Sequence, residues 1–242
     1  MWWAGVALAA LACGCGSGDK AARRQQASSA RESAAGPGLH ACGRASAGIR
    51  TTAIPSAGGV LKAAVLGRGP TAVIFANTGS SGPCPWLPLA RRLVHRGARA
   101  VVFEYGEGTP ATEVAAVARW AGRTGARRIA LVGAGPGARA VVIAAVQHPE
   151  LVASLVSLSA EQLQNGQHDL VPYARRLRRP VLWVGSREDN LTNWGSDTRR
   201  LSRATRSRHE LLVVRAGWAI ELLAGAPAAR VVPALERFVL GT

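Results

Sequence analysis

Negative charge, aromatic side chains and lysine are all scarce in this sequence. Its 242 residues include 14 Asp and Glu against 30 Lys and Arg, 5% aromatic residues, and lysine only at Lys20 and Lys62. The formal net charge of +16 would attract the protein to anionic surfaces, unless it only reflects an arginine-rich composition inherited from a GC-rich genome. The basic residues occur as scattered pairs without interleaved aromatics or a zinc-finger spacing, which argues against specific nucleic-acid binding.

Cysteine is also scarce, and the four cysteines show no metal-ligand spacing. Cys13 and Cys15 follow an apolar run at residues 2–12, which is too short to span a bilayer and has the length of a signal-peptide core. Residues 1–15 resemble a bacterial lipoprotein signal, in which the cysteine after the cleavage site carries lipid. We expect Cys13 to be lipidated, with Cys15 as the alternative and an ordinary secretory signal as a further one. The mature protein would then be a membrane-anchored lipoprotein, or periplasmic or extracellular.

The remaining cysteines, Cys42 and Cys84, are expected in separate loops. In an oxidising compartment they are candidates for one disulfide bond, and two free thiols are the alternative. Cys42 falls within residues 16–47, a segment of Ala, Ser, Gly, Gln and Arg with almost no large apolar side chain. Because such a composition cannot form a core, we expect a flexible low-complexity tether that precedes a folded domain of residues 48–242.

Apolar runs and helical patterns alternate through residues 48–242. Repeated strand and helix units of this spacing predict an α/β fold, with a mostly parallel eight-stranded sheet and helices on both faces. The expected strands are residues 49–54, 60–66, 71–76, 98–103, 128–132, 152–158, 181–184 and 211–214. The expected helices include residues 86–97, 111–125, 138–146 and 219–239.

Several motifs occur in the order in which the α/β-hydrolase family has them. NTGSSG at 77–82 follows the third strand, where that family places part of its oxyanion hole, and EYGEG at 104–108 looks like its tyrosine- and glycine-rich turn. GAGPG at 133–137 falls at the GxSxG nucleophile elbow. PVLWVGSREDNLT at 180–192 and RHELLVVRAGW at 208–218 look like the segments that carry the catalytic acid and histidine. The chain thus resembles an α/β-hydrolase with little or no lid.

The catalytic positions that this resemblance implies are mostly empty. Gly135 stands at the nucleophile position and has no side chain, while Trp218 stands at the histidine position and its indole nitrogen can only donate. The family's oxyanion hole uses the N–H of the residue after the nucleophile, which here is Pro136 and has none. Only Asp189 remains, as a vestigial acid. The resemblance therefore implies a pseudoenzyme.

Two other interpretations remain open. Residues 133–138 also match the G-x-G-x-x-A dinucleotide fingerprint, with Glu161 after the following strand, although the motif lies on the fifth strand and Pro136 removes an N–H. Alternatively, an active hydrolase of esters or peptides could use relocated groups. Ser80 or Ser81 and His168 are all expected at the carboxyl edge of the sheet.

We expect binding in the cell envelope rather than catalysis, with no cofactor and no metal. The sequence does not specify the ligand or envelope partner. The former active-site cleft would include Asn77, Thr78, Trp86 and Trp194. Trp86 and Trp194, together with Trp218, would serve either as a stacking or apolar platform for a ligand or as partly buried packing residues.

Overall fold

The computed structural model describes residues 39, 42, 49–78, 82–160, 169–188 and 194–241, and of 194–196 only the backbone. Several residues singled out above lie outside this part of the chain. They are Cys13 and Cys15 with the rest of the signal, nearly all of the tether, Ser80, Ser81, Glu161, His168, Asp189 and the side chain of Trp194.

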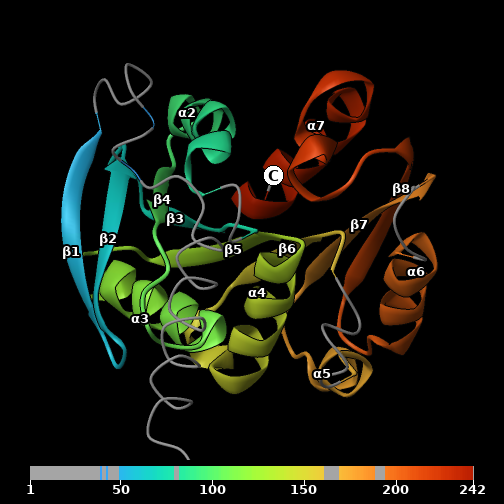
Figure 1. The fold of residues 1–242 in the computed structure, drawn as a ribbon, viewed down its shortest axis with the longest axis horizontal. Coiled ribbons are helices and arrows are strands. Elements are labelled where there is room, and N and C mark those ends of the chain that lie inside the picture. The colour runs from blue at the N-terminus through green and yellow to red at the C-terminus, as the bar shows by residue number, and fades with distance from the viewer. Residues whose placement is uncertain are drawn as a thin grey trace, which may run out of the picture. The chain divides into compact units, whose positions relative to one another are not determined.

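The described residues form one eight-stranded sheet with the order β1-β2-β4-β3-β5-β6-β7-β8 (Figure 1). Strand β2 pairs antiparallel with β1 and β4, and all other neighbouring strands are parallel. The mostly parallel sheet expected from the sequence is thereby confirmed. Its strands are β1 Arg50–Ser56, β2 Gly59–Leu66, β3 Thr71–Ala76, β4 Arg99–Phe103, β5 Arg128–Ala134, β6 Ser154–Leu158, β7 Val181–Glu188 and β8 His209–Ala216.

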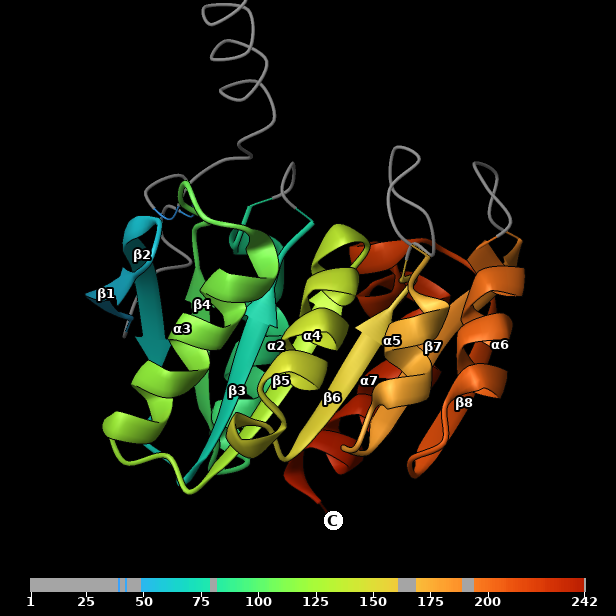
Figure 2. The same ribbon diagram turned by 90° about the horizontal axis from the view of Figure 1, so that it is seen from below.

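Helices cover both faces of the sheet, as Figure 2 shows. One face carries α2 (Leu87–His95) and α7 (Gly225–Leu240). The other carries α3 (Pro110–Arg123), α4 (Pro136–Gln147), α5 (Val171–Arg176) and α6 (Trp194–Ala204). Short 3-10 helices η2 (Cys84–Trp86), η3 (Pro149–Leu151) and η4 (Ala219–Leu223) lie in the connections.

Each face of the sheet has its own apolar core, because successive side chains of a strand point to opposite faces. Ile74 and Val101 belong to the core beneath α3 and α4. Their chain neighbours Phe75 and Val102 belong to the core beneath α2 and α7. The central strands are therefore apolar on both sides, which explains their nearly continuous apolar runs.

The helix expected over residues 219–239 is divided in the structure. Ala224 has an extended backbone, with φ −126° and ψ 161°, and separates η4 from α7. Pro227 lies in the first turn of α7, where its missing N–H needs no helical partner. In an uninterrupted helix, the same proline would fail to donate to the carbonyl of Leu223.

Cys42 and Cys84 form a disulfide bond, with a sulfur–sulfur distance of 2.10 Å and a Cα–Cα distance of 5.2 Å. The pairing expected from the sequence is confirmed. Leu39 is also attached to the domain, because its N–H donates to the carboxylate of Glu104. Two residues of the segment 16–47 are thus fixed to connections of the domain, one to η2 and one to the residue after β4, before β1 begins.

Candidate functional site

The centre of the candidate site is the turn from β5 into α4. Strand β5 ends at Ala134 and α4 begins at Pro136, so Gly135 alone connects them. Its backbone has φ 54° and ψ −121°, a left-handed φ that glycine adopts without steric cost. The N–H of Gly135 donates to the carbonyl oxygen of Leu158 at 2.9 Å, which ties the turn to the end of β6.

The other two glycines of GAGPG allow close packing around this turn. A Cβ atom on Gly133 would lie 2.3 Å from the carbonyl oxygen of Gly137. A Cβ atom on Gly137 would lie 2.2 Å from the carbonyl oxygen of Ala76, at the end of β3. Helix α4 therefore starts directly against β3 and β5, and packing within the protein accounts for both glycines.

The loops after β3, β5 and β8 meet at Gly135. A Cβ atom built on Gly135 would lie 3.1 Å from Cζ2 of Trp218, 3.6 Å from Cβ of Ala219 and 3.7 Å from Cγ2 of Thr78. The structure thus brings together Gly135, Thr78 and Trp218, three of the residues selected from the sequence. The indole ring of the half-buried Trp218 lies over the place where a side chain of residue 135 would begin.

Contacts to neighbouring elements fix the backbone on which Trp218 sits. Its N–H donates to Oε2 of Glu221 at 3.1 Å. The next N–H, that of Ala219, donates to the buried Oγ of Ser159 at 3.1 Å. Ser159 and Ala219 both have positive φ, 51° and 49°, a conformation that non-glycine residues rarely adopt.

Ser159 and Glu221 were not selected from the sequence. The spacing of Glu221, three residues after Trp218, is that of the acidic residue in a capping box and could have identified it. Nothing in the sequence around Ser159 marks it, because its role depends on the end of β6 meeting the loop after β8.

Proline at position 136 removes a donor from this edge of the sheet. Pro136 is the first residue of α4, where its lack of an N–H costs the helix nothing. An oxyanion hole that needs this N–H would consequently be one donor short. The backbone of α4 is otherwise regular here, with the N–H of Arg139 donating to the carbonyl oxygen of Gly135 at 3.2 Å.

Asn77 is buried directly after β3 and lies at the centre of a small group of polar contacts. The Nδ2 of Asn77 donates to the carbonyl oxygen of Phe103 at 3.3 Å, and its buried Oδ1 has no hydrogen-bond partner among the described residues. Tyr105 donates its hydroxyl to the carbonyl oxygen of Asn77 at 3.4 Å. Burial, reinforced by the negative charge of Glu113, raises the pKa of Tyr105 far above its usual range. The phenol therefore remains a protonated donor.

The glycine-rich turn after β4 is held by one buried carboxylate. Glu113 of α3 is fully buried and accepts hydrogen bonds from the N–H groups of Gly106 at 2.9 Å and Gly108 at 2.7 Å. Both carboxylate oxygens of Glu113 thus accept hydrogen bonds from the backbone. Glu113 supports the loop around Tyr105 and is not available to a substrate.

The tryptophans selected for the cleft occupy different environments. Trp86 is 1% exposed and packs against Phe75 at a ring-centroid distance of 5.0 Å, so it is a core residue that offers no surface to a ligand. Trp194 begins α6, and its side chain lies outside the described part. Asp189, Ser80, Ser81 and His168 also lie outside it.

The described residues form neither a metal site nor a membrane span. They contain no cluster of three or more His, Cys, Asp or Glu side chains that could hold a metal ion. Their helices include none that is both long and apolar enough to cross a membrane.

Comparison with solved structures relates this geometry to known proteins. Dienelactone hydrolase from Anabaena variabilis is similar with a TM-score of 0.67 and 14% sequence identity, over 80% of this chain and 97% of that one. Est1E from Butyrivibrio proteoclasticus is similar with a TM-score of 0.64 and 16% identity, over 79% of this chain and 98% of that one. The esterase Pf2001 from Pyrococcus furiosus is similar with a TM-score of 0.66 and 13% identity, over 79% of this chain and 91% of that one.

The sequence itself matches no protein-family model and no curated protein. At identities this low, structural similarity establishes the fold alone. The strand order, the helical layers and these neighbours together show that the chain has the α/β-hydrolase fold.

Proposed function

We propose that this chain is an exported α/β-hydrolase-fold protein that has lost catalysis and acts by binding a ligand or partner in the cell envelope. The observation that carries the proposal is the indole ring of Trp218, which lies 3.1 Å from the point where a nucleophilic side chain at Gly135 would start. In this proposal, Trp218 takes the place of the base with a ring that cannot accept a proton, and Gly135 takes the place of the nucleophile with no side chain.

The neighbouring residues support the same proposal. Pro136 withholds the N–H that an oxyanion hole would use, and Asp189 is left as an acid without a histidine to orient. These losses are independent of one another. A ligand would bind near Asn77, Thr78 and Trp218, where the loops after β3 and β8 meet.

Export is supported by the disulfide between Cys42 and Cys84, since such bonds persist mainly in oxidising compartments. The apolar residues 2–12, followed by Cys13 and Cys15, support the same conclusion. We propose that Cys13 carries the lipid and that residues 16–47 connect it to the domain.

The test is hydrolysis of p-nitrophenyl esters together with labelling by a fluorophosphonate probe. We expect no turnover above the buffer background and no labelling, because nucleophile, base and one oxyanion donor are absent. Turnover at an enzyme-like rate, abolished by Ser80→Ala, Ser81→Ala or His168→Ala, would instead establish a hydrolase with relocated catalytic groups.

A repair series tests the assignment of each position. Gly135→Ser alone should stay inactive, because triad members act as a unit. Adding Trp218→His should give weak activity, and adding Pro136→Ala should raise it by about 10² to 10³ by restoring an oxyanion donor. Asp189→Asn in the repaired variant should reverse the gain. If the triple variant stays inactive although folded, the assigned positions are wrong.

A further inference from the structure

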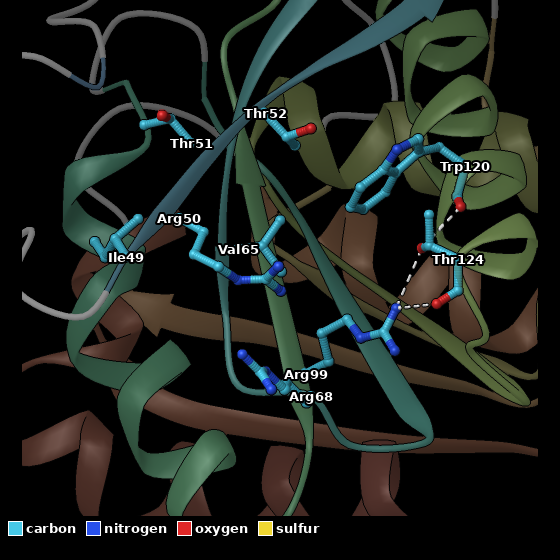
Figure 3. A pocket seen from close by; sticks show the side chains of 9 residues that line it. All are labelled: Ile49, Arg50, Thr51, Thr52, Val65, Arg68, Arg99, Trp120 and Thr124. Atoms are coloured by element: carbon cyan, nitrogen blue, oxygen red, sulfur yellow. Dashed lines mark hydrogen bonds between the residues drawn. The ribbon is translucent and has the colours of Figure 1, made fainter.

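A hollow of about 680 Å³ lies at the amino edge of the sheet, on the face that α3 covers. Arg50 shares this face with Ile54, which packs in the core beneath α3. Helix α3 ends at Arg123, and beyond its last turn the first residues of β1 and β4 remain uncovered. The hollow is therefore formed where the helix stops before the sheet does (Figure 3).

Three arginines point into this hollow, and no carboxylate lines it among the residues that the structure describes. Arg50, Arg68 and Arg99 come from β1, from the turn before β3 and from the start of β4 (Figure 3). Within the described part of the chain, the side chains of Arg50 and Arg68 have no hydrogen bond or ion pair. Arg99 donates through Nη1 to the carbonyl oxygen of Thr124 at 3.1 Å and to its Oγ1 at 3.2 Å, and its buried Nε has no partner among the described residues.

A second hollow lined by arginines provides a comparison, because most of its arginines donate hydrogen bonds to other groups of the protein. It lies between α3, β5 and η3, has a volume of about 330 Å³, and includes the carboxylate of Glu150. There Arg179 donates to the carbonyl oxygen of Pro149 at 2.7 Å, and Arg128 donates to the carbonyl oxygen of Val239 at 3.4 Å. Three of its four arginines, Arg119, Arg128 and Arg179, thus have a side-chain partner in the described residues, whereas in the larger hollow only Arg99 does.

We propose that the larger hollow is a binding site for a phosphate monoester. Three like charges held close together repel one another, and a dianionic phosphate with three acceptor oxygens would neutralise them. Guanidinium groups form paired hydrogen bonds with phosphate oxygens. Thr52 and Thr124 add hydroxyl groups, and Trp120 with Val65 provides an apolar wall for the organic part of the ester.

This site is separate from the candidate site of the previous subsections. Arg99 begins β4, whereas Gly135 follows the end of β5, and both strands run parallel to β3. The hollow and Gly135 therefore lie at opposite edges of the sheet. Phosphate binding does not depend on whether the chain has lost hydrolysis.

The phosphate could belong to a soluble ester or to a lipid headgroup, and two experiments distinguish these sources. The full-length protein is titrated with glycerol 3-phosphate by calorimetry. It is also floated with vesicles of phosphatidylcholine, with and without phosphatidic acid. The test variant is Arg50→Glu with Arg68→Glu, both exposed side chains. The matched control is Arg206→Glu with Arg208→Glu, which makes the same charge change at exposed positions before β8, at the far end of the same edge.

Saturable binding of glycerol 3-phosphate, weakened about tenfold or more in the test variant and retained in the control, supports a soluble phosphate ester as ligand. If binding is seen only with phosphatidic acid vesicles, and is weakened in the test variant but retained in the control, the ligand is a lipid headgroup. Arg99→Lys, which keeps the charge but loses the planar fork, should weaken binding in whichever assay is positive. Absence of binding in both assays, or an equal loss of binding affinity in the two double variants, would overturn the proposal.

Discussion

Gly135 alone forms the turn from β5 into α4, at a left-handed φ that favours glycine. Gly135→Ser should lower the free energy of unfolding by about 1–3 kcal/mol, because a non-glycine residue at φ 54° is strained and its Cβ would press on Trp218. The measurement is the urea unfolding midpoint.

Gly122→Ser provides the matched control for this substitution. Gly122 lies near the end of α3, and beyond its own helix a Cβ there would meet, among the described residues, only Cδ1 of Ile129 at an ordinary 3.8 Å. Since serine has a higher helix propensity than glycine, the control should be neutral or stabilising by a few tenths of a kcal/mol. Equal losses in the two variants would show that Gly135 is under no special constraint.

The sequence could predict which residues occupy the candidate site but not how they lie. Gly135 and Pro136 follow from their place in GAGPG, and Trp218 follows from Ala216-Gly217 before it. The position of the indole ring over Gly135 depends on hydrogen bonds from Ala219 to Ser159 and from Trp218 to Glu221. The first of these joins residues far apart in sequence, so no local pattern reveals it.

Among the elements, strands were more predictable than helices. Strand β3 spans residues 71–76, as expected, because its apolar run has sharp polar boundaries. Strand β5 continues two residues beyond the expected 128–132, since Gly133 and Ala134 pair with β6. The short helix α5 was not expected, because its six residues hold too few turns to show a helical period.

Helices α2 and α7 are joined by a buried carboxylate. Glu236 of α7 is 4% exposed and accepts from Nε of Arg92 at 2.7 Å and from Nη1 of Arg96 at 3.0 Å. Glu236→Gln should lower the free energy of unfolding by about 1–3 kcal/mol, because a neutral amide loses both charge-assisted bonds and sets an NH₂ group against a guanidinium. Urea unfolding measures the change.

An exposed ion pair provides the comparison. Nε of Arg215 lies 3.2 Å from Oε1 of Glu188, and the side chains of Glu188 and Arg215 are 57% and 87% exposed. Solvent screens such a pair, so Glu188→Gln should change the stability by no more than about 0.5 kcal/mol. If the two substitutions have equal effects, Glu236 does not join the helices as described.

For the whole molecule, the disulfide is the main covalent constraint in the described part. Cys42 and Cys84 are separated by 42 residues, and closing a loop of that length should stabilise the folded state by about 4 kcal/mol through the lost entropy of the unfolded chain. Cys42→Ser with Cys84→Ser should remove this stabilisation, measured as the difference in urea unfolding free energy. Reduction of the wild type with dithiothreitol should cause the same loss of unfolding free energy. A double variant as stable as the oxidised wild type would show that the disulfide does not stabilise the fold.

The same bond determines how the domain would bear mechanical load. Tension applied from the N-terminal side reaches Cys42 before it reaches β1, and the bond to Cys84 passes it to η2 and the start of α2. Among the described strands, β1 lies at the edge of the sheet and pairs only with β2, so a direct pull would separate its hydrogen bonds one after another. The disulfide takes the force past this weak edge, so the sheet should resist being peeled open from its N-terminal side.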